Sequence, residues 1–185
     1  MPEDAIHAGP SAGARPSDDL VDTFQKEWDA SHPEEKFVCV PAVTRLVRIS
    51  EYIERAVEAT LAEFDLTRGE AEVLFALVRN PQLDITPKIL QTLMLISSGG
   101  LTRRLDHLER KGLIVRRPDP NDRRGTVLKP TPEGVELTLK AHHAHVETEA
   151  RLISVLDEPE KAFLELLLKK LILAQEAKLD PSGLS

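Results

Sequence analysis

The sequence contains a single cysteine, Cys39, so it cannot hold an intrachain disulfide framework, and we expect it in a reducing compartment. It lacks any uninterrupted apolar run of the roughly 20 residues that span a bilayer, so we expect no membrane helix. The first residues, Met1–His7, carry neither the basic nor the apolar region of a secretory signal. These absences predict a cytoplasmic protein.

Positive charge is also scarce, since the net charge of −7 argues on average against a nucleic-acid partner. The distribution of charge along the chain reverses that argument. Residues 101–129 carry nine basic and four acidic side chains, whereas residues 1–40 carry three basic and nine acidic ones. A chain of this kind can present a basic face to DNA while its acidic remainder limits non-specific binding.

The motifs of enzymes are missing. The sequence has no paired nucleophile and base, no phosphate-binding glycine loop and no metal cluster, so we expect neither an enzyme nor a bound cofactor. His142, His143 and His145 do not have the i, i+4 spacing that places two ligands on one helical face, although His142 and His145 come near it. We interpret these histidines as solvated helix surface.

The patterning divides the chain into a lead and one domain. Residues 1–17 are rich in proline, glycine and serine and bury almost nothing, which predicts a disordered lead. Residues 18–185 then predict a mainly α-helical domain with a small β-hairpin. Helices are expected over 18–30, 41–64, 67–80, 87–94, 97–112 and 131–156 and from 157 onward, with strands over 113–117 and 126–128.

The order of these elements predicts a winged helix-turn-helix. Ser97 caps a helix that carries leucines on one face and Arg103, Arg104 and Arg110 mostly on the other, and a turn-rich basic hairpin follows it. A helix fits the major groove, and arginine is favoured in the narrow minor groove that a wing reaches. Gly99 and Gly100 leave room for backbone N–H groups to approach a phosphate.

The last helix is too apolar to stand alone. Its leucines, isoleucine and phenylalanine between Phe163 and Leu173 leave hardly any polar face, and a second copy of the chain is the simplest cover. We therefore expect a homodimer built from the N-terminal helices, 18–64, and the C-terminal helices, 132–185, with the DNA-binding lobe at 65–131.

Three segments resemble the MarR family of transcriptional regulators: Asp122-Arg123-Arg124, the run from Glu109 to Ile114, and Leu128 through Thr131-Pro132-Glu133-Gly134. The resemblance implies that Asp122 holds the wing through a salt bridge and that Arg123 and Arg124 contact the minor groove or phosphates. It also implies that Ser98, Thr102, Arg103 and Arg104 face the major groove or its backbone.

The chain is similar, more narrowly, to the urate-responsive subgroup of this family, which adds an N-terminal helix with a tryptophan. That resemblance implies an anion pocket formed by Trp28, Glu72 and Arg116, with Arg104 coupling the ligand to DNA. Glu72 stands where the subgroup has aspartate, so the expected effector is a small organic anion, urate-like or a carboxylate.

The sequence thus predicts a ligand-responsive, sequence-specific DNA-binding regulator, expected to be a repressor of a pseudopalindromic operator. Two alternatives stay open. Cys39 lies roughly where peroxide-sensing relatives carry a reactive cysteine, which would make the repressor redox-sensing. A winged helix can also bind an acidic protein partner through its basic face.

Overall fold

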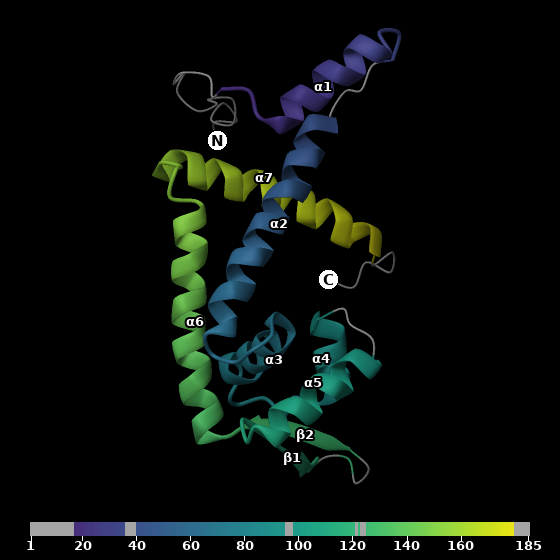
Figure 1. Cartoon of the computed structure of the whole chain (residues 1–185). Coiled ribbons are helices and arrows are strands. Elements are labelled where there is room, and N and C mark those ends of the chain that lie inside the picture. The colour runs from purple at the N-terminus through teal and green to yellow at the C-terminus, as the bar shows by residue number, and fades with distance from the viewer. Residues whose placement is uncertain (1–16, 36–39, 95–97, 121, 123–124, 180–185) are drawn as a thin grey trace, which may run out of the picture. The chain divides into compact units, whose positions relative to one another are not determined.

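The computed structural model describes residues 17–35, 40–94, 98–120, 122 and 125–179, and it gives a mainly α-helical chain with a two-stranded wing, as predicted. The predicted disordered lead lies, except for Ser17, outside the described residues. Figure 1 labels the elements: α1 Leu20–Ser31, α2 Val40–Ala62, α3 Arg68–Arg79, α4 Pro87–Met94, α5 Ser98–Arg110, β1 Ile114–Pro118, β2 Thr126–Pro130, α6 Pro132–Leu152 and α7 Glu158–Leu179.

The chain divides into two compact units. One comprises residues 1–48 and 152–185, and the other comprises residues 49–151. The second unit therefore contains, besides the predicted DNA-binding lobe, the C-terminal part of α2 and nearly all of α6. The predicted assignment of residues 18–64 and 132–185 to dimerisation stays a prediction.

The second unit encloses the hydrophobic core. Its apolar residues come from α2, α3, α4, α5, both strands and α6, and Ala71, Val73, Leu74, Leu90 and Leu108 are completely buried. Burial of a leucine or valine side chain stabilises a fold by about 1.5–3 kcal/mol. This shared core fixes α5 against α3 and α4.

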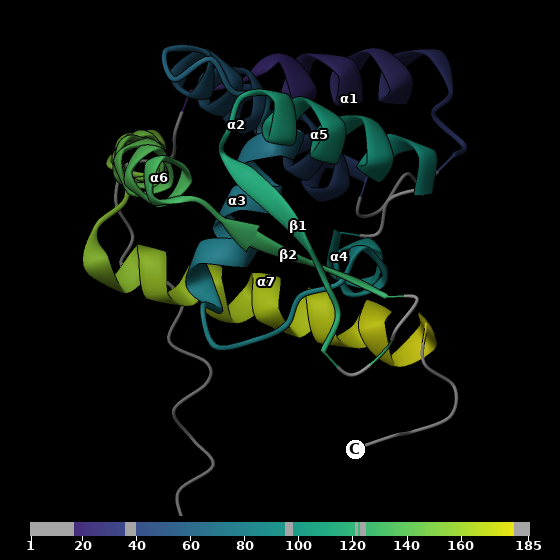
Figure 2. The same cartoon turned by 90° about the horizontal axis from the view of Figure 1, so that it is seen from below.

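The wing is an antiparallel hairpin in which Ile114 pairs with Pro130 and Pro118 pairs with Thr126. It extends from the end of α5, and β2 leads back to the start of α6 (Figure 2). Ile85 adds a bridge to Leu128 that was not predicted. Both strands extend beyond their predicted ends, because the pairing continues through Pro118 and Pro130.

Local capping sets the start of several helices. The predicted capping box at Thr67 and Glu70 is confirmed, as is the one at Asp157 and Glu160. Thr86 accepts a hydrogen bond from the N–H of Ile89, as expected of an N-cap. The predicted cap at Ser97 lies outside the described residues.

Two predicted helix ends were wrong. α2 stops at Ala62 rather than near Phe64, because Asp65 adopts a left-handed conformation with a φ of 55° and turns the chain. α6 stops at Leu152 rather than near Leu156, where the N–H of Leu156 bonds instead to the carbonyl of Ile153 in a turn. In both places the apolar periodicity continues past the last helical hydrogen bond.

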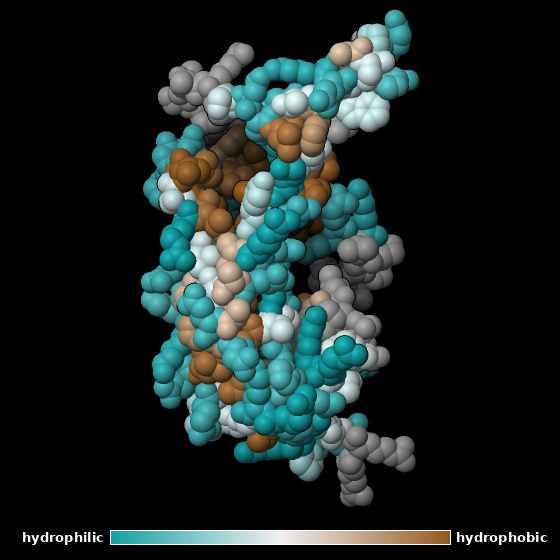
Figure 3. Space-filling model, in the orientation of Figure 1, coloured by the Kyte–Doolittle hydropathy of each residue, from teal (hydrophilic) through white to brown (hydrophobic). Residues whose placement is uncertain are grey.

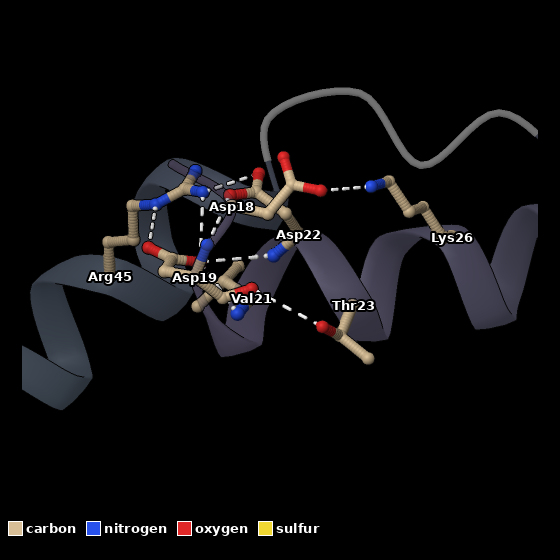
Figure 4. A network of polar contacts seen from close by, with 7 residues as sticks. All are labelled: Asp18, Asp19, Val21, Asp22, Thr23, Lys26 and Arg45. Atoms are coloured by element: carbon tan, nitrogen blue, oxygen red, sulfur yellow. Dashed lines mark hydrogen bonds and ion pairs between the residues drawn. The ribbon is translucent and has the colours of Figure 1, made fainter. Parts of the chain in front are cut away.

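In the first unit, Arg45 of α2 binds the start of α1 through ion pairs (Figure 4). Its Nε donates to Asp19 Oδ2 at 2.8 Å, and its Nη2 donates to Asp22 Oδ1 at 2.6 Å. Asp19 and Asp22 also form a capping box for α1, which the sequence reading missed. The bonds from Arg45 and from the backbone N–H of Asp22 lower the pKa of Asp19 to about 2.

The first unit also exposes much apolar surface. Brown surface gathers over α7 and the first turns of α2 in Figure 3. The exposed apolar side chains of α2 and α7 in this unit include Val47, Leu166, Leu171, Ile172 and Leu173, each about half exposed. Among the helices of the described residues, none combines the length and the hydropathy needed to cross a membrane.

Candidate nucleic-acid interface

Helix α5 separates an apolar face from a basic one. Leu101, Leu105 and Leu108 are buried in the core, whereas Thr102, Arg103 and Arg110 are exposed. The helix ends at Arg110, and in the turn that follows, Gly112 has a φ of +70°, which suits a residue without a side chain. The core therefore holds one face of α5, and its basic face remains open to a ligand.

The open face is shallowly hollowed. Gly99, Thr102, Arg103, Asp106 and Arg110 line a surface depression of about 620 Å³. A Cβ on Gly99 would meet no atom within 4 Å, so the backbone is accessible there. Exposed guanidinium groups beside accessible helical backbone suit the phosphates and base edges of a duplex.

Arg116 joins the wing to α5. From strand β1, its Nη2 donates to Asp106 at 2.6 Å and its Nη1 donates to Glu109 at 2.7 Å. These bonds neutralise the two acidic side chains of α5, which would otherwise repel phosphate. Arg117, the next residue, is exposed.

The buried carboxylate of Glu70 joins α3 to α5. Glu70 is 3% exposed, accepts the backbone N–H of Thr67 at 2.9 Å, and contacts His107 Nδ1 through its other oxygen. Burial alone would raise the pKa of Glu70, but the hydrogen bonds from Thr67 and His107 outweigh it and lower that pKa. One carboxylate thus both caps α3 and contacts the last turn of α5.

A second hollow lies on the inner side of α5, against the start of α3. Its volume is about 1000 Å³. It is lined mainly by charged side chains, including Glu58, Arg68, Glu72, Arg103, Arg104 and His107. Arg104 Nη1 is buried there and has no hydrogen-bond partner among the described residues. An unpaired buried donor costs about 1–3 kcal/mol, so this nitrogen favours an incoming acceptor.

The structure describes only some of the residues that were predicted to contact DNA. Thr102 and Arg103 are exposed on the open face of α5, whereas Arg104 turns to the inner hollow. Ser98 is the first residue of α5, and its side chain lies outside what the structure describes, as do Arg123 and Arg124. Asp122 is exposed and its carbonyl accepts the N–H of Gly125 at 2.8 Å, so its salt bridge stays a prediction.

The structure brings together only two of the four residues that were predicted to bind the ligand. Glu72 and Arg104 line the inner hollow together, with Glu72 paired to Arg68 at 3.1 Å. Arg116 is paired instead with the two α5 carboxylates. Trp28 belongs to the other compact unit, where it lines a small hollow with Phe24 and His32.

The sequence reading missed Arg68, Gly69, Glu70 and His107 as parts of this site. Glu70 was recognised only as a helix cap, and its buried contact with His107 spans 37 positions. His107 does follow Arg104 by one helical turn, which could have placed both on one face. Cys39 lies outside the described residues, so redox sensing remains untested, and within those residues no metal-binding cluster occurs.

Comparison with known proteins gives a consistent result. A profile described as MarR family matches residues 64–125. The HTH-type transcriptional regulator PecS of Dickeya dadantii (strain 3937) is 30% identical over 80% of this chain and 90% of its own length. The multiple antibiotic resistance protein MarR of Salmonella typhimurium is 33% identical over 72% of this chain and 92% of its own length.

Solved structures agree. Wild-type MarR from E. coli in its apo form has a TM-score of 0.62 and 30% identity, covering 74% of this chain and 98% of that one. A cysteine-to-serine mutant of the same protein, complexed with operator DNA, has the same TM-score and identity and covers 78% and 96%. These relatives are regulators rather than enzymes.

Proposed function

Because the chain belongs to the MarR family of winged helix-turn-helix regulators, we propose that it is a cytoplasmic repressor that binds a pseudopalindromic operator as a homodimer. It is a DNA-binding regulator of transcription, as its relatives are. The observation that carries the proposal is the open face of α5, where Thr102, Arg103 and Arg110 are exposed opposite a leucine face that the core buries.

The proposed dimer uses the apolar surface of the first unit. Leu166, Leu171, Ile172 and Leu173 of α7 are about half exposed, and so is Val47 of α2. Exposed apolar patches of this kind mark association surfaces, and a second copy of the chain places two recognition helices about one DNA turn apart. Both half-sites are then bound together.

The proposed effector is a small organic anion, urate-like or a carboxylate, in the inner hollow. Arg104 Nη1 lacks a partner there, and the nearby Glu72 carboxylate can accept an N–H or O–H from a ligand. A guanidinium binds planar anions through parallel hydrogen bonds. Ligand binding would change the position of α5 and release both half-sites.

A fluorescence-anisotropy titration tests the DNA part of this proposal. The purified protein is titrated against a duplex selected from a random library and against a scrambled duplex, at several salt concentrations. We expect preference for the selected duplex and a steep loss of affinity with salt. Equal, weak binding to both duplexes would overturn sequence-specific recognition and leave the winged helix to an acidic protein partner.

The same titration with urate and a panel of aromatic carboxylates tests the effector. We expect one of these anions to release the selected duplex, and Arg104→Gln to weaken that response. Glu136→Gln serves as the control, because Glu136 is exposed on α6 and pairs with Lys140 of the same helix. Release that is unchanged in Arg104→Gln would place the effector elsewhere.

A further inference from the structure

The hydroxyl of Thr131 lies between the end of α5 and the start of α6. Its Oγ1 donates to the carbonyl of Gly112 at 2.7 Å and accepts the N–H of Gly134 at 3.0 Å. The last carbonyls of one helix and the first N–H groups of the next otherwise lack partners. A single side chain therefore caps α6 and also bonds to the turn that follows α5.

The backbone closes the same joint. Beyond Gly112, the N–H of Leu113 bonds back to the carbonyl of Leu108 at 3.0 Å, which ends α5 in a Schellman motif. The carbonyl of Leu113 then accepts the N–H of Thr131 at 3.0 Å. The turn that follows α5 is thus bonded directly to the residue that precedes α6.

Gly134 makes this close approach feasible. A Cβ at this position would lie 2.0 Å from the carbonyl oxygen of Leu113, which is backbone and cannot turn aside. Gly134 is buried, and its own carbonyl accepts the hydroxyl of Thr138 at 2.5 Å. The residues Gly112, Leu113, Thr131 and Gly134 are called the α5–α6 joint below.

Helix α6, which follows the joint, is itself held by the core and by α2. Ala141 of α6 is completely buried in the core, and Thr148 of α6 bonds to Thr60 of α2 at 2.8 Å between their hydroxyls. The wing hairpin leaves the joint at Ile114 and returns at Pro130, and these two residues pair with each other. This pairing brings the two ends of the hairpin together at the joint.

We propose that the α5–α6 joint is a rigid coupling that makes the orientation of α5 follow α6, with Thr131 as its positioning residue. This inference rests on the proposed dimeric recognition of DNA. In such a dimer the orientation of each recognition helix then depends on that of its own α6. One inserted base pair moves a half-site by about 3.4 Å and rotates it by about 34°. With a rigid joint, α5 cannot reorient to reach the displaced half-site, whereas with a loosened joint it can.

Three substitutions separate the joint from simple helix capping. Thr131→Ser keeps both hydrogen bonds. Thr131→Asp can still accept the N–H of Gly134 and cap α6, but an ionised carboxylate cannot donate to the carbonyl of Gly112. Thr131→Val loses both bonds at nearly constant shape. The full-length proteins are titrated against the selected operator and against the same operator with one base pair inserted between its half-sites.

The readout is the dissociation constant for the operator with the inserted base pair divided by that for the selected operator. A uniform loss of stability or a change of net charge affects both constants equally and cancels in this ratio. We expect a ratio of about tenfold or more for the wild type and Thr131→Ser. For Thr131→Asp and Thr131→Val we expect the ratio to fall by at least about threefold. Melting temperatures confirm that each variant is folded.

The outcomes are distinguishable. If Thr131→Asp keeps the wild-type ratio, Thr131 only caps α6, and the coupling is overturned while the proposed function stands. If Thr131→Val alone unfolds, Thr131→Asp still decides the question. If the wild type itself tolerates the inserted base pair without loss, dimeric recognition of two half-sites is wrong, and the coupling falls with it.

Discussion

The guanidinium of Arg104 lies over the bare Cα of Gly69, so closely that a Cβ there would be 2.3 Å from Arg104 Cζ. Gly69 belongs to the first turn of α3 and Arg104 belongs to α5. Because Gly69 has no side chain, the guanidinium of Arg104 can occupy this position. This relationship holds the proposed ligand-binding arginine inside the DNA-binding lobe.

Gly69→Ala should move Arg104 without unfolding the protein. The obstructing atoms are the end of a flexible side chain, and alanine favours a helix over glycine by about 0.5–1 kcal/mol. We expect an unchanged or higher melting temperature together with a several-fold weaker response to the effector anion. A crystal structure of the variant checks the displacement, and Gly99→Ala, which meets no atom within 4 Å, is the matched control for stability. An Arg104 in its original place would contradict the prediction.

Glu70→Gln should lower the free energy of unfolding by about 1–3 kcal/mol at pH 7, because it removes a buried, charge-assisted acceptor. The lowered pKa of Glu70 sets the sign of the pH dependence. Its contribution is complete above the ordinary value of 4.5 and is lost as the pH falls further. The difference between variant and wild type should therefore shrink below about pH 4.5.

Urea unfolding between pH 3 and pH 8 measures this difference. Glu160→Gln is the control, since Glu160 has the same capping role at α7 and makes no hydrogen bond to a second helix within the part of the chain that the structure describes. It should cost about 0.5–1 kcal/mol. Equal losses for the two variants would mean that the contact between Glu70 and His107 adds no stability.

Arg45→Met should detach α1 from α2. Asp19 and Asp22 then lose their shared partner, although the capping box of α1 remains. Trp28 is the single tryptophan of the chain and lies in α1, so its fluorescence anisotropy reports the mobility of this helix. We expect faster depolarisation in the variant. Lys26→Met is the control, because the Lys26–Asp18 pair lies at the surface of α1 alone.

Acid should have the same effect in the wild type. The pKa of Asp19 is lowered from 3.8 to about 2, so its contribution is present above pH 3.8 and is lost as the pH falls toward 2. The anisotropy of Trp28 in the wild type should therefore approach that of Arg45→Met in this range. A flat profile between pH 4 and pH 2 would show that Asp19 does not hold α1.

Arg116→Ala should weaken DNA binding more than it weakens the fold. The side chains of Arg116, Asp106 and Glu109 are each about a third to a half exposed, so the stability loss should be below about 1 kcal/mol. The two freed carboxylates would then repel phosphates. We expect a several-fold loss of operator affinity that the further changes Asp106→Asn and Glu109→Gln largely restore.

Arg117→Ala is the control on the same strand, since successive side chains of a strand point to opposite faces. The rescue distinguishes a repelled phosphate from a lost arginine contact. Without any rescue, Arg116 would itself contact DNA. An effector response that is unchanged in Arg116→Ala would remove this residue from the proposed ligand pocket.

The sequence predicted those features whose causes are local. The boxes at Thr67 and Asp157 depend on side chains three residues apart, and α4 begins and ends as its threonine, proline and apolar pattern indicate. The box at Asp19 was missed because it pairs two aspartates instead of the usual threonine or serine with glutamate. The early end of α2 was missed because a left-handed aspartate has no clear sequence signal.

The sequence by itself determined the winged helix-turn-helix, because apolar periodicity, caps and turn residues act within a few positions of one another. It also determined the basic character of α5 and its wing, because charge is additive along a segment. Only the tertiary structure decided which charges meet. It placed Arg104 over Gly69, Glu70 against His107 and Arg116 against α5, and it joined α5 to α6 at Thr131. These contacts depend on how separate elements pack around one core, and packing brings together residues whose spacing in the chain carries no trace of the contact.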